Sequence, residues 1–261
     1  MTVIFAMPIE QMALIALAGF AAGALNAVAG GGTLISFPVL MAVGLPAVTA
    51  NVTNTIALCP GYLGAAWAQR ADLRGQRARL GVLLPIASLG GLLGGALLLR
   101  TSDHAFSSAV PWLILLACVL LAGQERLRGT LQRRGMAGVV ARAAPLWSLP
   151  LLAVAAVYGG YFGAGMSVII LAMLGLALTD DLPRLNALKQ ALALAANSAA
   201  AFWLALSTQV NWKLVALLGV SALLGGTCGG RFARTLSPAL LQRAMVSLGV
   251  VLALIYLLRV R

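Results

Sequence analysis

The sequence predicts an all-α membrane protein: a polytopic helix bundle of two inverted-topology repeats, each containing a glycine-broken helical hairpin. Of the 261 residues, 61% are hydrophobic and only 9% are charged, whereas soluble domains carry about 25% charged residues. Apolar runs of helical length recur along the whole chain and lack the alternating polarity of barrel strands. Glycine clusters at 30–32 and 159–165 interrupt two of these runs, one in each half of the chain.

Length and flanking residues divide the apolar sequence into ten candidate helices. A helix needs about 20 residues to span about 30 Å of hydrocarbon, and segments 33–44 and 166–178 fall well short of that length. We expect both to be half-helices; full crossing by these segments would change the orientation of the termini. The ten segments are 9–28, 33–44, 47–68, 79–99, 105–123, 146–162, 166–178, 184–206, 214–233 and 237–258.

A glycine motif occurs twice and relates the two halves of the chain. Residues 90–95 are Gly-Gly-Leu-Leu-Gly-Gly and residues 225–230 are Gly-Gly-Thr-Cys-Gly-Gly, an offset of 225 − 90 = 135 residues. Small residues at this spacing allow helix backbones to approach closely, so we assign both copies to packing. The predicted units are a first transmembrane repeat at 1–123, a cytoplasmic basic linker at 124–144 and a second transmembrane repeat at 145–261.

The distribution of positive charge predicts the orientation. Four arginines lie in 70–79 and five in 124–144, and cytoplasmic loops carry an excess of Lys and Arg, so we expect both segments in the cytoplasm. If each broken hairpin enters and leaves on one side, helix 47–68 begins outside and helix 184–206 begins inside, which makes the repeats inverted. The net charge of +12 comes from such loops, so we predict no nucleic-acid partner.

The triple glycine 30–32 predicts a helix break at membrane depth. An unpaired backbone group in hydrocarbon costs several kcal/mol, so a break survives only where protein or water surrounds it. The breaks before Thr33 and, at Gly163 and Gly165, before Ser167 would each present N–H groups and the positive end of a helix dipole. Two such ends meeting near the midplane suit an anion; the alternative is a packing kink. A nucleotide-binding phosphate loop is excluded, because no Gly-Lys-Ser/Thr follows.

Two polar helix faces follow the two breaks. Asn51 and Asn54 share a face of helix 47–68, and the offset of 135 residues places Asn186 and Lys189 at the equivalent positions, with Asn197 further along. An ionisable residue inside a membrane segment indicates function by default, and two matching faces favour a shared polar cavity. The alternatives are hydrogen bonds to neighbouring helices and, for the lysine, snorkelling to the membrane interface.

The residue types that are missing at membrane depth exclude other chemistry. All six acidic residues fall in predicted loops or at helix ends, so carboxylate-based proton or sodium coupling is not expected. The three cysteines lie in apolar runs without a CxxC motif, and His104, the single histidine, falls in a predicted turn. We therefore predict no metal site, no cofactor and no catalytic residue.

Several motifs together resemble a known transporter family. They are Gly23-Ala-Leu-Asn26 followed by Gly30-Gly31-Gly32-Thr33 and Pro38, then Ala50-Asn51-Val-Thr53-Asn54, Gly163-Ala-Gly165, and Ala187-Leu-Lys189 with Asn197. In this order and spacing, across essentially the whole chain, they resemble the TauE/SafE sulfite exporter family, also called the toluene sulfonate uptake permease (TSUP) family. The resemblance implies a bacterial inner-membrane carrier of small organosulfur anions such as sulfite, sulfonates or sulfoacetate. Met166 stands where a third glycine would complete the second break.

We expect a secondary transporter that moves a small anion across the lipid bilayer by alternating access. The breaks would bind the anion through backbone N–H groups, Asn51 and Asn54 would orient it, and Lys189 would balance its charge. An anion channel and a non-transporting membrane scaffold are the alternatives, an enzyme is not expected, and a homo-oligomer remains open. The predicted substrate site comprises Gly30, Gly31, Gly32, Thr33, Asn51, Asn54, Gly163, Gly165, Ser167, Asn186, Lys189 and Asn197.

Overall fold

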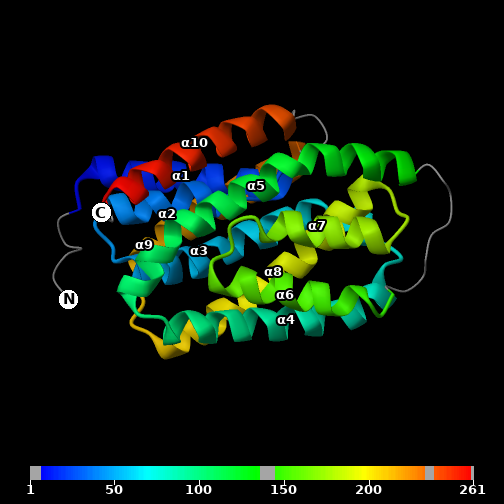
Figure 1. Cartoon of the computed structure of the whole chain (residues 1–261), viewed down its shortest axis with the longest axis horizontal. Coiled ribbons are helices and arrows are strands. Elements are labelled where there is room, and N and C mark those ends of the chain that lie inside the picture. The colour runs from blue at the N-terminus through cyan, green and yellow to red at the C-terminus, as the bar shows by residue number, and fades with distance from the viewer. Residues whose placement is uncertain (1–6, 136–144, 233–237, 260–261) are drawn as a thin grey trace.

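The chain folds into a bundle whose helices run roughly along one common direction (Figure 1). The computed structural model describes residues 7–135, 145–232 and 238–259, and within them it contains ten α-helices, one 3₁₀ helix and no β-strand. The elements are α1 (Ile9–Val28), α2 (Thr33–Ala42), α3 (Ala47–Ala68), η1 (Arg70–Leu73), α4 (Arg77–Arg100), α5 (Asp103–Gly135), α6 (Ser148–Tyr161), α7 (Met166–Ala177), α8 (Leu182–Ser207), α9 (Trp212–Phe232) and α10 (Pro238–Arg259).

The all-helical membrane fold and the two short segments are confirmed. α2 has 10 residues and α7 has 12, about half of what a membrane crossing needs. Among the described residues, five helices are long and apolar enough to cross a membrane: Ile9–Val28, Arg77–Arg100, Asp103–Gly123, Leu182–Ser207 and Trp212–Phe232.

One predicted helix end was wrong. The helix expected at 105–123 continues as α5 to Gly135 and so enters the predicted linker. The sequence after 123 is rich in Arg, Leu and Gln, which have high helix propensity, so the helix continues although its composition becomes polar. Linker residues 136–144 lie outside the described part of the chain, and the division at 124–144 stays a prediction.

The two broken hairpins enter the bundle from opposite ends. In Figure 1 the hairpin of α1 and α2 opens towards the end that holds the N-terminus, and the hairpin of α6 and α7 opens towards the other end. α3 and α8, which follow the hairpins, therefore begin at opposite ends of the molecule. This arrangement fits the inverted repeats that the sequence predicts.

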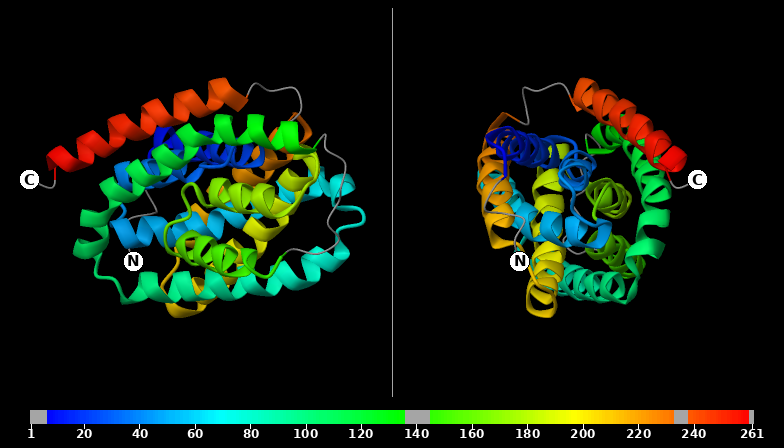
Figure 2. Two further views of the ribbon diagram at one scale, coloured as in Figure 1. Left: turned by 45° about the vertical axis from the view of Figure 1, so that its right-hand side comes forward. Right: turned by 90° about the vertical axis from the view of Figure 1, so that its left-hand side faces the viewer.

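The two halves of the chain that the sequence predicts to be repeats, called the first and second repeat below, interleave in space. α4 packs against α6 and α8 of the second repeat, and α9 packs against α1 and α3 of the first. α3 and α8 pack against each other, while α5 and α10 lie side by side on one flank of the bundle (Figure 2). Exchanging α1, α3 and α4 with α6, α8 and α9 leaves these contacts unchanged, as an approximate two-fold relation requires.

The repeated glycine motif makes the interleaving possible. A Cβ atom added at Gly91 of α4 would lie 2.0 Å from the carbonyl oxygen of Ala196 in α8. At the equivalent Gly226 of α9 it would lie 2.1 Å from the carbonyl oxygen of Gly61 in α3. Any side chain at these positions would force the helices apart, which confirms that the motif serves close backbone packing.

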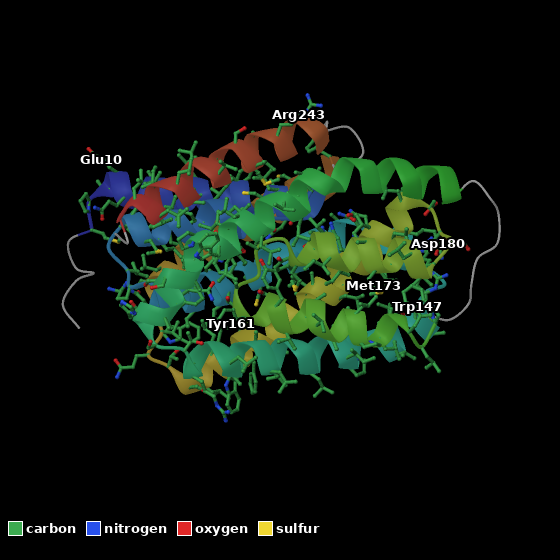
Figure 3. All side chains as sticks on the ribbon, in the orientation of Figure 1. Glu10, Trp147, Tyr161, Met173, Asp180 and Arg243 are labelled. Atoms are coloured by element: carbon green, nitrogen blue, oxygen red, sulfur yellow. The ribbon has the colours of Figure 1, made fainter. Side chains whose placement is uncertain are left out.

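A buried ionic cluster joins the repeats at one end of the bundle. Asp180, in the loop before α8, accepts hydrogen bonds from Arg79 of α4 and, at 3.0 Å, from Nε of Arg184. Gln76 Nε2 donates to the backbone oxygen of Arg184 at 3.2 Å. Figure 3 places Asp180 at the end of the molecule opposite Glu10, so these carboxylates are far from the middle of the bundle.

Substituting alanine for Gly91 should destabilise the bundle, because the added methyl group would overlap the backbone of α8. We expect a loss of about 1–3 kcal/mol in the free energy of unfolding, the usual effect of overpacking. Thermal unfolding of the purified protein in detergent measures it.

The matched control is Gly81→Ala in the same helix, where the new Cβ meets no described atom within 4 Å. Better helix propensity should leave this variant as stable as the parent or slightly more so. Equal midpoints for the two variants would contradict the packing role of Gly91.

Candidate functional site

Each half-helix is preceded by backbone that only glycine adopts easily. α1 ends at Val28 and α2 begins at Thr33, and between them Gly30 and Gly31 both have φ of +86°. Before α7, Gly163 and Gly165 have φ of +85° and +80°. Because no side chain clashes at these angles, the chain can reverse direction within a few residues inside the bundle. The helix breaks predicted from the glycines are therefore present.

The two breaks meet. A Cβ atom added at Gly30 would lie 2.8 Å from Cβ of Ser167, the second residue of α7. Reciprocally, a Cβ atom at Gly163 would lie 3.6 Å from Oγ1 of Thr33, the first residue of α2. The N-terminal ends of α2 and α7, which come from different repeats, thus lie next to each other.

These helix ends carry backbone donors. The N–H of Gly32 donates to Oδ1 of Asn26 at 2.7 Å. Within the described residues, no acceptor lies in hydrogen-bonding position for the N–H groups of Gly31, Thr33 or Ser167. The first N–H groups of a helix point along its positive dipole end, so α2 and α7 together make a small electropositive centre.

Amide side chains from α3 contact both breaks. Oδ1 of Asn54 accepts from Oγ of Ser36, and its Nδ2 lies 3.5 Å from Oγ1 of Thr33, both in α2 of the same repeat. Asn51 crosses to the other repeat, where its Nδ2 donates to the carbonyl oxygen of Tyr161 at 2.8 Å. That oxygen is one of the last in α6, so Asn51 satisfies the end of the second broken helix.

The amides of α8 hold the first broken helix in the same way. Nε2 of Gln190 donates to the carbonyl oxygens of Asn26 and Ala27, both at 2.9 Å. Nδ2 of Asn186 lies 3.4 Å from the oxygen of Ala27. These carbonyls belong to the last turn of α1. Each interrupted helix is therefore capped at its C-terminal end by side chains from the opposite repeat.

Lys189 lies inside the bundle. Its side chain is 0% exposed and is among the largest fully buried side chains of the described residues. Two of its neighbours on α8, Asn186 and Gln190, contact the carbonyl end of α1. Snorkelling to the membrane interface, the alternative considered above, would leave the end of the side chain exposed, which the structure excludes.

Asn197 contacts α3 at Thr55, the residue that follows the predicted site residue Asn54. Its Nδ2 donates to the oxygen of Thr55 at 2.8 Å and lies 3.2 Å from Sγ of Cys59. It therefore connects α8 to α3, two helical turns or about 12 Å along the axis from Lys189. Asn26 and Gln190, absent from the predicted set, contact the first break directly. Their polarity within apolar helices beside predicted residues was the signal that could have identified them.

Comparisons with known proteins show the family of the chain. The family model described as "Sulfite exporter TauE/SafE" matches residues 15–256. A "Probable membrane transporter protein" of Haemophilus influenzae is 26% identical over 243 residues, covering 91% of each chain. A "Probable membrane transporter protein ORF9" of Sinorhizobium sp is 26% identical over 249 residues, covering 93% of this chain and 91% of the relative. No solved structure matches the chain.

The contact between the breaks predicts a specific pair of effects. Gly30→Ala should destabilise the protein more than Gly44→Ala, although both residues have positive φ, of +86° and +96°. Both variants bear backbone strain of about 1–3 kcal/mol, but only the methyl group at position 30 meets a described neighbour, Ser167, within 4 Å. Thermal midpoints of the purified variants measure the difference.

A double mutant separates contact from strain. Adding Ser167→Gly should recover part of the stability lost in Gly30→Ala, because it removes the atom against which the new methyl group packs. The same addition should not rescue Gly44→Ala. Rescue of neither variant would mean that the two breaks do not touch.

Proposed function

The chain belongs to the TauE/SafE sulfite exporter family, and from this membership we propose that it is a secondary transporter of a small organosulfur anion. The anion is sulfite, a sulfonate or a related compound, and the transporter moves it across the bacterial inner membrane by alternating access. The family and the names of its two relatives support the transporter class.

One observation carries the choice of an anion: the N-terminal ends of two interrupted helices lie side by side at the glycine breaks. N–H groups and helix dipoles favour a negatively charged group and disfavour a cation. Lys189 is buried on α8, the helix that holds the end of α1, and in its protonated form it would add a positive charge to the anion site that we propose.

The proposed roles of the polar side chains differ according to their hydrogen bonds. In this proposal the hydroxyl groups of Thr33 and Ser167, one on each helix end, bind the anion together with the backbone N–H groups. Asn54 already bonds Ser36 and Thr33, so it positions the hydroxyls of α2. Asn51 positions the end of α6 in the same way.

Burial of the site supports a carrier in an occluded state. Thr33 is 3% exposed, Ser167 is 1% exposed and Lys189 is 0% exposed, so solvent reaches the proposed site from neither end. An anion channel requires a continuous aqueous path, which this closed arrangement does not favour. Inverted repeats supply two equivalent arrangements of the same contacts, one open to each side, and this is the physical basis of alternating access.

Neutralising Lys189 should abolish most of the transport. We expect Lys189→Gln to lower the uptake of labelled sulfite or sulfoacetate into proteoliposomes at least about tenfold, which corresponds to losing about 1.4 kcal/mol of interaction with the anion. Lys213→Gln, which removes the same charge from an exposed position on α9, should keep parental flux. Thermal midpoints establish that both variants are folded. Equal flux in the two variants would remove Lys189 from the mechanism.

Single-channel recording provides the second arm of the experiment. A carrier gives no unitary currents under the conditions in which vesicle flux is measured. Resolved anion currents would replace the carrier by a channel, while the absence of both flux and currents would support a non-transporting scaffold.

A further inference from the structure

A cleft of about 450 Å³ opens where α3 gives way to η1, lined by Ala68, Arg70, Ala71 and Arg74. This volume falls in the range of small-molecule sites. Nη1 of Arg70 donates to the oxygen of Trp67 at 2.9 Å, and its guanidinium carbon lies 4.5 Å from the centroid of the indole ring. These contacts fix the guanidinium group in place while most of its N–H donors stay available.

The charge around the cleft is strongly positive. Residues 70–77 hold three arginines and one aspartate, Asp72, a net charge of +2. Two further acidic residues lie in the loop before α8: Asp180 is paired with Arg79 and Arg184, and Oδ1 of Asp181 accepts from the backbone N–H of Arg184 at 3.0 Å. A cleft lined by one sign of charge concentrates counter-ions and speeds their association, so this cleft attracts small anions.

A single residue connects the cleft to the first break. Gln69 lies between two lining residues but is itself buried, 7% exposed. Its Nε2 is 3.4 Å from the oxygen of Ala27, three residues before Gly30, and its Oε1 accepts from Nδ2 of Asn186 at 2.7 Å. The Gln69–Asn186 hydrogen bond joins the two repeats at a residue that lies between Ala68 and Arg70, which line the cleft.

Behind this hydrogen bond lie polar atoms that the described residues leave without partners. They are Oδ1 of Asn186, Oε1 of Gln190 and Nδ2 of Asn26, all buried. Leaving a buried polar atom unpaired costs about 1–3 kcal/mol, and such atoms call for water or a ligand. Together they mark a polar route from the cleft towards the glycine breaks.

We propose that the cleft is the vestibule of the transporter at its arginine-rich end. Arg70 and Arg74 bind the sulfite or sulfonate group as it enters or leaves, and opening of the Gln69–Asn186 bond admits it to the breaks. The role of the vestibule depends on the proposed function. The vestibule would be a second anion-recognition site, outside the central one, at the arginine-rich end of the protein.

The test measures the concentration dependence of sulfite transport in inside-out and right-side-out membrane vesicles. In the double variant Arg70→Gln/Arg74→Gln, KM should rise about fivefold or more at low ionic strength, with little change in maximal rate, because steering acts on association. The rise should occur in inside-out vesicles alone, where the arginine-rich end faces the substrate, and should shrink at high salt. Arg70→Lys/Arg74→Lys should restore most of the affinity.

Arg100→Gln is the matched control, since it removes an exposed charge at the opposite end of α4. It should leave KM in inside-out vesicles unchanged. An unchanged KM in the Arg70/Arg74 double variant overturns the vestibule; if Lys189→Gln still blocks flux, the central site stands. Absence of flux in the parent overturns both proposals.

Lipid composition distinguishes a free anion from a lipid headgroup. In proteoliposomes of phosphatidylcholine alone, the KM difference between parent and double variant should persist. If it appears only when phosphatidylglycerol is present, the arginines bind lipid, and the vestibule is overturned.

Gln69→Ala, which removes the Gln69–Asn186 hydrogen bond, should increase the passive leak of sulfite. Lower thermal stability without leak would reduce Gln69 to a structural role and overturn the proposed closure.

Discussion

Backbone polarity inside a membrane protein is the constraint on which this architecture depends. An interrupted helix exposes carbonyl oxygens at one end and N–H groups at the other, and hydrocarbon satisfies neither. Here the carbonyl end of α1 is held by Gln190 and that of α6 by Asn51, each from the opposite repeat. The repeats therefore stabilise each other's breaks, and neither hairpin is complete alone.

The same constraint explains the chemistry of the centre. Amide side chains take up the carbonyl ends, while the N–H ends of α2 and α7 stay turned towards each other. The N-terminal ends of α2 and α7 contribute the positive ends of two helix dipoles and the hydroxyl groups of Thr33 and Ser167. Lys189 is buried on α8. The acidic residues of the described ranges, such as Asp180 and Glu10, lie towards the ends of the bundle instead. This arrangement of helix ends fits the anion that we propose as the substrate.

Local features of the fold could be predicted from the sequence, and relations between distant segments could not. Half-helices follow from run length, and breaks follow from glycine. The change to a polar composition predicts a helix end at residue 123. Residues of high helix propensity follow, however, and α5 continues to Gly135. Periodicity puts Asn197 on the same face as Lys189, but it does not predict the helix contact that Asn197 makes, a hydrogen bond to the oxygen of Thr55 in α3. The offset of 135 residues identifies equivalent positions in the two halves of the chain. It does not predict which helices of one half pack against which helices of the other.

The exchange of α4 and α9 between the repeats has a consequence for synthesis. Gly91 packs against the backbone of Ala196, which is synthesised 196 − 91 = 105 residues later. The ribosome must therefore add these residues before the packing partner of Gly91 is present. Until then the glycine face of α4, which packs against α6 and α8 in the folded protein, contacts lipid or the insertion machinery instead. Helix packing in this protein is consequently completed late in synthesis. The first half of the chain acquires its final helix contacts only after the second half has been inserted.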